Sequence, residues 1–163
     1  ASKLKKGAII FSYPVKNPSR FGVVTLKGKK IVSLIEKPTN TNSNLAITGL
    51  YFFDNSVVKK TLGLKNSKRY ELEIIDLLKM YKKNNLLKTE ALGRGAAWLD
   101  AGTIEDFNQT SLFVSAIEKR QGLKIACLEE IAFLNKWINK NKLREAISFY
   151  GNCDYSKYLR GLF

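Results

Sequence analysis

The chain has 163 residues, of which 45% are hydrophobic and 11% aromatic, so it is long enough to bury a core as a single domain and is neither disordered nor fibrous. It has no histidine and two cysteines, which excludes Ser-His-Asp and Cys-His catalysis and a Cys/His zinc cluster within this chain. Its formal net charge of +14 suggests a nucleic-acid partner, but the lysines are scattered rather than arranged in one stripe, so we favour a solvated basic surface and expect no nucleic acid.

The predicted elements alternate between strands and helices over the first two thirds of the chain, and helices complete it. Hydrophobic runs bounded by turn residues predict strands at Gly7–Tyr13, Phe21–Leu26, Ile31–Ile35, Leu45–Phe53 and Leu86–Leu92. Helical spacing predicts a short helix ending at Thr61, longer helices over Glu71–Lys83 and Thr103–Arg120, and helices or helical turns within Glu129–Trp137, Lys142–Phe149 and Tyr155–Leu162. A short extended segment, Leu123–Cys127, precedes the last three.

Local signals place the ends of these elements. Lys27–Lys30 is typical of a hairpin turn, so the strands on either side of it should pair antiparallel. Asp54 or Asn55 is well placed to cap the short helix, and Thr103 with Asp106 forms a capping-box pattern. Both of these helix starts therefore have a polar residue that can accept a backbone hydrogen bond.

The expected fold class is α/β, a mixed sheet with a helical C-terminal appendage, in one domain whose sheet part covers residues 1–103 and whose helical part covers residues 104–163. No apolar stretch reaches the roughly 20 residues that span a bilayer, and the N-terminus lacks the apolar core of a signal peptide. We therefore expect a cytoplasmic protein with no membrane partner. In that compartment Cys127 and Cys153 are expected as reduced thiols rather than as one disulfide.

Two polar clusters could bind a sugar phosphate. Glu36 and Lys37 end a strand at a proline, where a carboxylate can accept hydrogen bonds from two sugar hydroxyls and an ammonium can neutralise a phosphate. Arg69 precedes a helix with Glu71 and Glu73 in its predicted first turn, and its planar fork suits a bidentate phosphate contact. The alternatives are a surface ion pair at the strand end and an exposed arginine paired with one of those glutamates.

A third cluster, Trp98–Thr103, combines an aromatic wall with a carboxylate. Asp100 follows an apolar run, and Mg²⁺ takes one or two carboxylates and keeps waters and substrate phosphates as its other ligands. The alternative is that Asp100 caps the turn. No Gly-rich phosphate loop opens a strand–loop–helix unit between Ala1 and Phe163, so the clusters supply half of a sugar-nucleotide site and predict a truncated enzyme.

Taken in order, these clusters resemble glucose-1-phosphate thymidylyltransferase over nearly the whole chain. The segments that carry the resemblance are Phe21–Val24, Ser33–Pro38, Ile47–Phe52, Arg69–Ile74, Gly93–Thr103, Glu118–Lys124 and Cys127–Phe133. The family's N-terminal Gly-x-Gly-x-Arg-Leu nucleotide loop and Gly-Asp-Asn segment do not occur in this sequence. The resemblance therefore predicts the C-terminal part only of such an enzyme, with a Rossmann-like nucleotide-diphospho-sugar transferase fold and the N-terminal nucleotide-binding half absent.

The resemblance implies transfer of a thymidylyl group from dTTP to glucose 1-phosphate with Mg²⁺ as cofactor. The products are dTDP-glucose and pyrophosphate, for dTDP-rhamnose, lipopolysaccharide and other cell-surface polysaccharide synthesis. It also implies a homo-oligomer, expected as a tetramer. Without the nucleotide-binding half, this chain alone is predicted to be inactive.

The resemblance also assigns site residues. It implies that the catalytic residues are Lys37, Arg69 and Asp100, of which the first two hold the sugar phosphate and Asp100 binds the metal. It implies a glucose site at Gly22, Glu36, Ile47, Thr48, Gly49 and Trp98. It implies a regulatory nucleotide site at Gly93, Arg94 and Glu130.

Two positions depart from the family pattern: Tyr70 stands where glycine is usual, and Ala101 where threonine is usual. Two alternatives stay open. One is a nucleotidyltransferase for UTP or for another sugar 1-phosphate, because the segment that selects the base is not found in the sequence. The other is a non-catalytic sugar-phosphate-binding or subunit-binding remnant.

Overall fold

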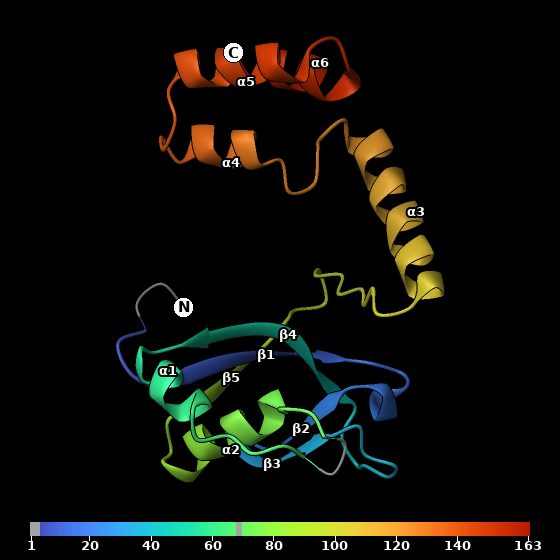
Figure 1. Cartoon of the computed structure of the whole chain (residues 1–163). Helices are drawn as coiled ribbons and strands as arrows, with labels where there is room; N and C mark the ends of the chain where they lie inside the picture. The colour runs from blue at the N-terminus through green and yellow to red at the C-terminus, as the bar shows by residue number, and fades with distance from the viewer. Residues whose placement is uncertain (1–3, 68–69) are drawn as a thin grey trace. The chain divides into compact units, whose positions relative to one another are not determined.

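The computed structural model describes residues 4–67 and 70–163 and divides into two compact units, residues 1–98 and residues 99–163 (Figure 1). We call them the sheet unit and the helical unit and describe each by itself. Within the described part of the chain, no helix is long and apolar enough to cross a membrane.

The sheet unit contains one five-stranded mixed sheet. Its strands are β1 (Ala8–Pro14), β2 (Gly22–Lys27), β3 (Lys30–Glu36), β4 (Leu45–Phe53) and β5 (Leu87–Ala91), in the spatial order β3-β2-β4-β1-β5. β1 and β5 are parallel, and the other neighbours are antiparallel. The predicted mixed sheet and the β2–β3 hairpin are therefore confirmed. The strand bounds agree closely with the prediction, and a short 3-10 turn, Pro18–Arg20, was not expected.

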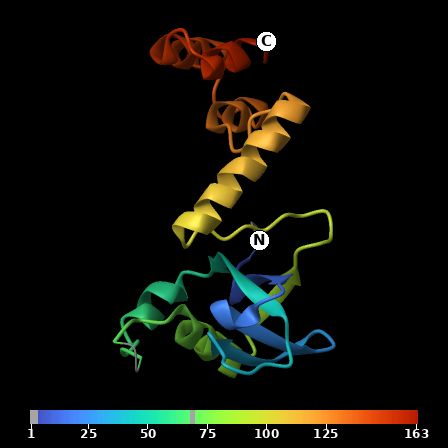
Figure 2. The same cartoon turned by 90° about the vertical axis from the view of Figure 1, so that its right-hand side faces the viewer.

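Helices α1 (Ser56–Thr61) and α2 (Ile74–Lys83) accompany this sheet, and α2 packs on it (Figures 1 and 2). The core between α2 and the sheet consists of Ile10, Val24, Ile31, Leu34, Ile47, Ile75 and Leu78. Alternation along β1 explains the arrangement, because Ala8, Ile10 and Ser12 are buried while the residues between them are only partly buried. Helix α2 therefore covers one face of the sheet.

The start of α2 differs from the prediction. The helix begins at Ile74, and Glu73 is the extended residue before it, so Glu71 and Glu73 do not lie in the first turn. The reason is local hydrogen bonding: Ser67 donates its hydroxyl to Glu73 Oε1 (3.1 Å) and its backbone N–H to the carbonyl of Glu71 (2.8 Å). These contacts give the backbone an alternative to the helix.

The cap of α1 comes from Asp54 rather than from Asn55. Asp54 Oδ1 accepts from the backbone N–H of Ser56 (3.0 Å) and from the hydroxyl of Tyr81 on α2 (3.0 Å), and Oδ2 accepts from the backbone N–H of Gly7 (2.6 Å). The Gly7 N–H, followed by the hydroxyl of Ser56, lowers the pKa of Asp54 to about 2. The Asp54 carboxylate thus links the residue before β1 to α1 and α2 by hydrogen bonds.

The helical unit contains α3 (Ile104–Gln121), α4 (Leu128–Leu134), α5 (Lys140–Tyr150) and α6 (Asp154–Arg160). Thr103 caps α3 as predicted, since its hydroxyl oxygen accepts from the backbone N–H of Asp106 (3.1 Å). The core consists of Cys127, Leu143, Ile147 and Leu159, with partly buried Phe133, Ile138, Tyr155, Tyr158 and Leu162 around it. The expected extended segment Leu123–Cys127 is a connection between α3 and α4 and pairs with no strand of the described sheet.

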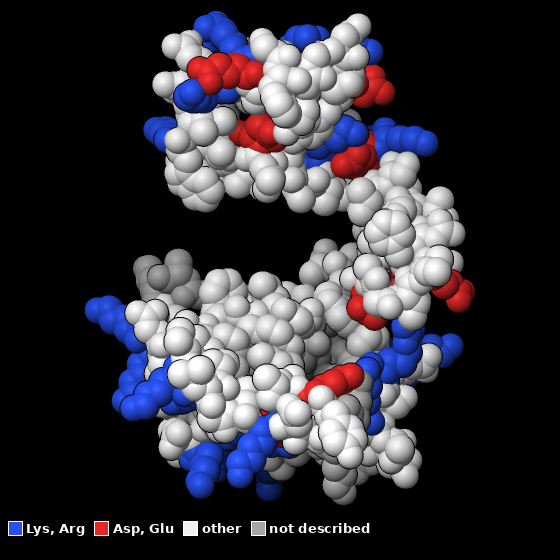
Figure 3. Space-filling model, in the orientation of Figure 1, with Lys and Arg blue, Asp and Glu red and all other residues white. Residues whose placement is uncertain are grey.

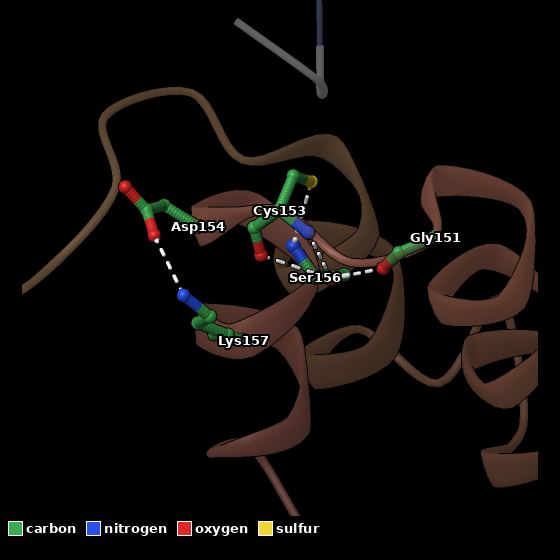
Figure 4. Close-up of polar contacts among 5 residues, drawn as sticks. All are labelled: Gly151, Cys153, Asp154, Ser156 and Lys157. Atoms are coloured by element: carbon green, nitrogen blue, oxygen red, sulfur yellow. Dashed lines mark hydrogen bonds and ion pairs between the residues drawn. The ribbon is translucent and has the colours of Figure 1, made fainter.

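Both cysteines are free thiols, as predicted. Cys127 is buried, whereas Cys153 is exposed and caps α6 (Figure 4). Its Sγ accepts from the backbone N–H of Ser156 (3.5 Å), and the hydroxyl of Ser156 accepts from the backbone N–H of Cys153 (3.2 Å). The hydrogen bond from the Ser156 backbone lowers the pKa of the Cys153 thiol.

Candidate functional site

The ends of β2 and β3 bring Gly22 and Glu36 together. The two residues are partners in the ladder, and a Cβ added at residue 22 would lie 3.1 Å from Glu36 Oε2 and 3.0 Å from Ile75 Cδ1. A side chain at residue 22 would therefore require small shifts of the Glu36 carboxylate and of the Ile75 side chain on α2. Glycine at this position leaves room for the Glu36 carboxylate and the Ile75 side chain beside the strand end.

Lys37 follows Glu36 in an unusual backbone conformation. Its φ is +40°, in the left-handed region that side chains other than glycine seldom occupy, and its N–H donates to the carbonyl of Phe21 (3.0 Å). Among residues 4–67 and 70–163, no carboxylate forms an ion pair with its ammonium. A charged group in a left-handed backbone conformation, with no ion-pair partner among the described residues, is suited to bind an anion.

A hollow of about 710 Å³ joins this strand end to α2. It is lined by Leu34, Ile35, Glu36, Lys37, Ser67, Glu73, Ile75, Asp76 and Lys79. The structure thus brings the Glu36–Lys37 cluster next to the segment that precedes α2. Sequence reasoning missed Asp76 and Lys79, although their spacing of three residues on a helix places them side by side.

Arg69 lies outside the described residues. Of its described neighbours, Tyr70 donates its backbone N–H to the carbonyl of Ser67 (2.9 Å). Tyr70 has a φ of +59°, and its side chain is 88% exposed. This left-handed conformation favours glycine, the residue that is usual at this position in the family the sequence resembles. The tyrosine ring points to solvent.

Trp98 belongs to a small aromatic group in the sheet unit. Its ring contacts Phe21 (centroids 5.1 Å apart) and Tyr13 (6.2 Å), and its Nε1 donates to the carbonyl of Thr48 (3.1 Å). Phe21 precedes Gly22, and its carbonyl accepts a hydrogen bond from the backbone N–H of Lys37. Because the Phe21 ring contacts Trp98, Phe21 connects Trp98 to the strand end that carries Glu36 and Lys37. The indole is held in a fixed orientation there.

The other residues assigned to glucose binding lie on β4. Ile47 is 6% exposed and belongs to the core under α2. Thr48 donates its hydroxyl to the carbonyl of Phe11 (3.2 Å), and Gly49 is exposed with a φ of +79°. Of these three, Gly49 has the most accessible surface for a ligand.

Asp100 and its neighbours belong to the helical unit. Its Oδ2 lies 3.1 Å from where a Cβ of Gly102 would stand, and its carbonyl accepts from the Thr110 hydroxyl (3.4 Å). In the described part of the chain, no group of three or more His, Cys, Asp or Glu side chains could hold a metal ion. One carboxylate is a suitable ligand for an ion that takes its other ligands from water and substrate phosphates, as Mg²⁺ does.

The residues assigned to a regulatory site fall in both units. Gly93 accepts the backbone N–H of Ala96 (2.9 Å) in a turn of the sheet unit, and Arg94 is exposed beside it. Glu130 lies in the first turn of α4, where Oε2 accepts from the hydroxyl of Tyr158 (2.7 Å). This carboxylate therefore already has a structural partner.

The basic charge is distributed over the surface. On the face shown in Figure 3, Lys and Arg side chains of the sheet unit stand in several separate groups with uncharged surface between them. Three lysines, Lys29, Lys30 and Lys82, line a hollow of about 260 Å³ away from Glu36. Lys37 therefore differs from the other surface lysines in its local environment, and the total charge of the chain does not identify it.

Comparison with known proteins places the chain in a family. The family model described as "Nucleotidyl transferase" matches residues 1–116. Glucose-1-phosphate thymidylyltransferase of Neisseria meningitidis serogroup A is 47% identical over 154 residues, which are 94% of this chain and 54% of that protein. The corresponding protein of Xanthomonas campestris pv. campestris strain B100 is 41% identical over 163 residues, 99% of this chain and 55% of that protein. The chain belongs to the nucleotidyl transferase family and spans about half the length of these relatives.

Solved structures agree on the fold. A crystal structure of a Bacillus anthracis protein assigned to glucose-1-phosphate thymidylyltransferase, in complex with a sucrose, has a TM-score of 0.62 and 34% identity and covers 69% of this chain and 45% of that one. Apo UDP-glucose pyrophosphorylase has a TM-score of 0.59 at 24% identity, which bears on the fold alone. The α/β fold with nucleotidyltransferase-like neighbours is therefore established.

One prediction is corrected by these matches. The chain was predicted to be only the C-terminal part of a thymidylyltransferase, without the N-terminal nucleotide-binding half. That is wrong, because the family model matches the N-terminal stretch, residues 1–116, so the homology is not that of a C-terminal part. The prediction gave the lack of a Gly-rich loop more weight than the matched segments support.

Proposed function

We propose that this chain binds glucose 1-phosphate for thymidylyl transfer from dTTP. The observation that carries the proposal is the hollow of about 710 Å³ in which Glu36 and Lys37 face the start of α2. Glu36 accepts hydrogen bonds from sugar hydroxyls, and Lys37, without an ion-pair partner in the described residues, contacts the phosphate. Arg69 serves as a second phosphate contact, and Gly22, Gly49 and Trp98 border the sugar. The thymidylyltransferase relatives support this choice of substrates.

The reaction needs no histidine. A phosphate oxygen of glucose 1-phosphate attacks the α-phosphorus of dTTP in line, a new P–O bond forms, the bond from the α-phosphorus to the bridging oxygen breaks, and pyrophosphate leaves. The attacking oxygen is already anionic, so no general base is required. Catalysis then consists of positioning the two phosphates and neutralising their charge.

Asp100 would hold a Mg²⁺ ion, whose chemistry when bound is to neutralise charge on the phosphates. Mg²⁺ accepts a single protein carboxylate when water and phosphates can supply its other ligands, so Asp100 alone would suit it. The hollow that carries the proposal is assigned to the sugar phosphate rather than to dTTP. Binding of the sugar phosphate is therefore the property to test first.

The test is isothermal titration of the chain with glucose 1-phosphate. Lys37→Gln should weaken binding about tenfold, because it removes a charge-assisted hydrogen bond, and Glu36→Gln should weaken binding of the sugar portion. Lys29→Gln, a change of the same charge in the turn before β3, should have no effect. The proposal is wrong if the unaltered chain does not bind glucose 1-phosphate or if Lys37→Gln and Lys29→Gln behave alike.

A further inference from the structure

A second charged pair lines the hollow from the side of α2. Lys79 Nζ lies 2.8 Å from Asp76 Oδ1, and both residues border the same space as Glu36 and Lys37. Their side chains are 54% and 40% exposed, so the pair lies at the rim and not in the core. Nothing in the resemblance assigns either residue a role.

Both acidic and basic side chains line the hollow. Among the described residues, Glu36, Glu73 and Asp76 contribute carboxylates to the lining, and Lys37 and Lys79 contribute ammonium groups. A sugar phosphate carries about two negative charges at neutral pH. A phosphate that enters the hollow would therefore compete with Asp76 for the Lys79 ammonium.

The Asp76–Lys79 pair can give up its contact at little cost. Exposed pairs three residues apart on a helix are weak, because water screens them and because holding two long side chains costs entropy. A phosphate oxygen attracts an ammonium more strongly than a solvated carboxylate does. The four-carbon stem of Lys79 also lets the ammonium move without moving the helix.

We propose that Lys79 is a phosphate-binding residue that exchanges its contact with Asp76 for the phosphate of the sugar phosphate. This inference rests on the proposed function and deepens it. Asp76 holds the lysine at the rim when the hollow is empty and competes with the phosphate for it. Lys79 thus adds a cation from α2 to the one that Lys37 supplies from the strand end.

The experiment measures the dissociation constant of glucose 1-phosphate for two variants whose effects differ in sign. Lys79→Gln should weaken binding three- to tenfold. Asp76→Asn should tighten it about two- to fivefold, because it removes the competing carboxylate. A merely structural pair would give loss or no change in both. Glucose, which has no phosphate, should bind both variants as it binds the unaltered chain.

Lys82→Gln is the matched control. It removes the same charge from the same helix, but Lys82 borders the separate lysine hollow with Lys29 and Lys30. It should leave the dissociation constant unchanged, and a circular dichroism melt of each variant checks folding. Equal effects of Lys79→Gln and Lys82→Gln would overturn the inference, as would weaker binding by Asp76→Asn.

The two proposals fail in different ways. If the unaltered chain does not bind glucose 1-phosphate, or if Lys37→Gln does not alter binding, the proposed function and this inference both fall. If Lys37→Gln weakens binding while Lys79→Gln does not, only the inference about Lys79 is overturned.

Discussion

Glu129 and Glu130 of the helical unit have different surroundings from the acidic residues around the hollow of the sheet unit. In the helical unit, Glu129 and Glu130 in the first turn of α4 accept hydrogen bonds from tyrosine hydroxyls. Tyr150 of α5 donates to Glu129 (2.7 Å), and Tyr158 of α6 donates to Glu130 (2.7 Å). Tyr155 also donates to Glu129. In the sheet unit, the acidic residues at the ends of β3 and α2 border a hollow that also contains Lys37.

This difference helps to locate the candidate site. The helical unit has short helices and a small core, and hydroxyl–carboxylate bonds connect them. The sheet unit has a larger core between α2 and the strands, so polar residues at the strand end are not needed for that packing. Charged groups around a hollow are then better candidates for ligand binding than carboxylates already held by tyrosines.

The largest expected effect separates the two cores. Leu78→Ala in α2 and Leu143→Ala in α5 each remove a fully buried side chain and should each cost about 2–5 kcal/mol of unfolding free energy. Because the cores are separate clusters, each change should act on its own unit. Hydrogen exchange, followed by mass spectrometry on peptides from each unit, measures the two free energies separately.

Surface changes of similar chemistry provide the control. Leu62→Ala and Leu134→Ala remove exposed leucines from the two units and should change protection by less than about 0.5 kcal/mol. Loss of protection in both units after either core change would contradict the comparison, because it would mean that they unfold together.

Asp54 should make the sheet unit sensitive to acid. Its folded-state pKa, lowered from 3.8 to about 2 chiefly by the Gly7 N–H, means that the ionised form stabilises the folded state. That contribution is fully present above about pH 4 and is lost as the pH falls towards 2. Asp54→Asn should lower the melting temperature at pH 7 and flatten its decline between pH 4 and pH 2.

The matched control for Asp54 is in the helical unit. Asp154→Asn neutralises a carboxylate whose side chain is 93% exposed, and it should leave the acid profile of the sheet unit unchanged. An Asp54→Asn variant that melts at the same temperature as the unaltered chain at pH 7 would show that the joint between β1, α1 and α2 does not contribute to stability.

Much of the sheet unit could be predicted from sequence because its signals are local. Apolar runs between Gly, Pro and Asn gave the strands, and Leu45–Phe53 was predicted with the bounds that β4 has. The start of α2 was missed because it depends on Ser67, which bonds across the turn to Glu71 and Glu73. A propensity pattern does not contain that contact.

The candidate site was only partly predictable for the same reason. Glu36 and Lys37 are adjacent in sequence at a strand end, so their chemistry could be inferred without a structure. Asp76 and Lys79 reach the hollow only because α2 packs beside β3, which is a tertiary contact. Their spacing predicts that they pair with each other, but not what they face.

The smallest expected effect concerns the cap of α6 in the helical unit. The Cys153 thiol accepts from the backbone N–H of Ser156, and a thiol is a weak acceptor (Figure 4). Cys153→Ala should therefore cost only about 0.5 kcal/mol, at the low end for a lost cap, whereas Cys153→Ser should retain or slightly increase stability. Hydrogen exchange of peptides that cover α6 measures both changes. If Cys153→Ser were as destabilising as Cys153→Ala, the sulfur would stabilise α6 through packing rather than as a cap. The helical unit would then depend on apolar contacts in the same way as the sheet unit.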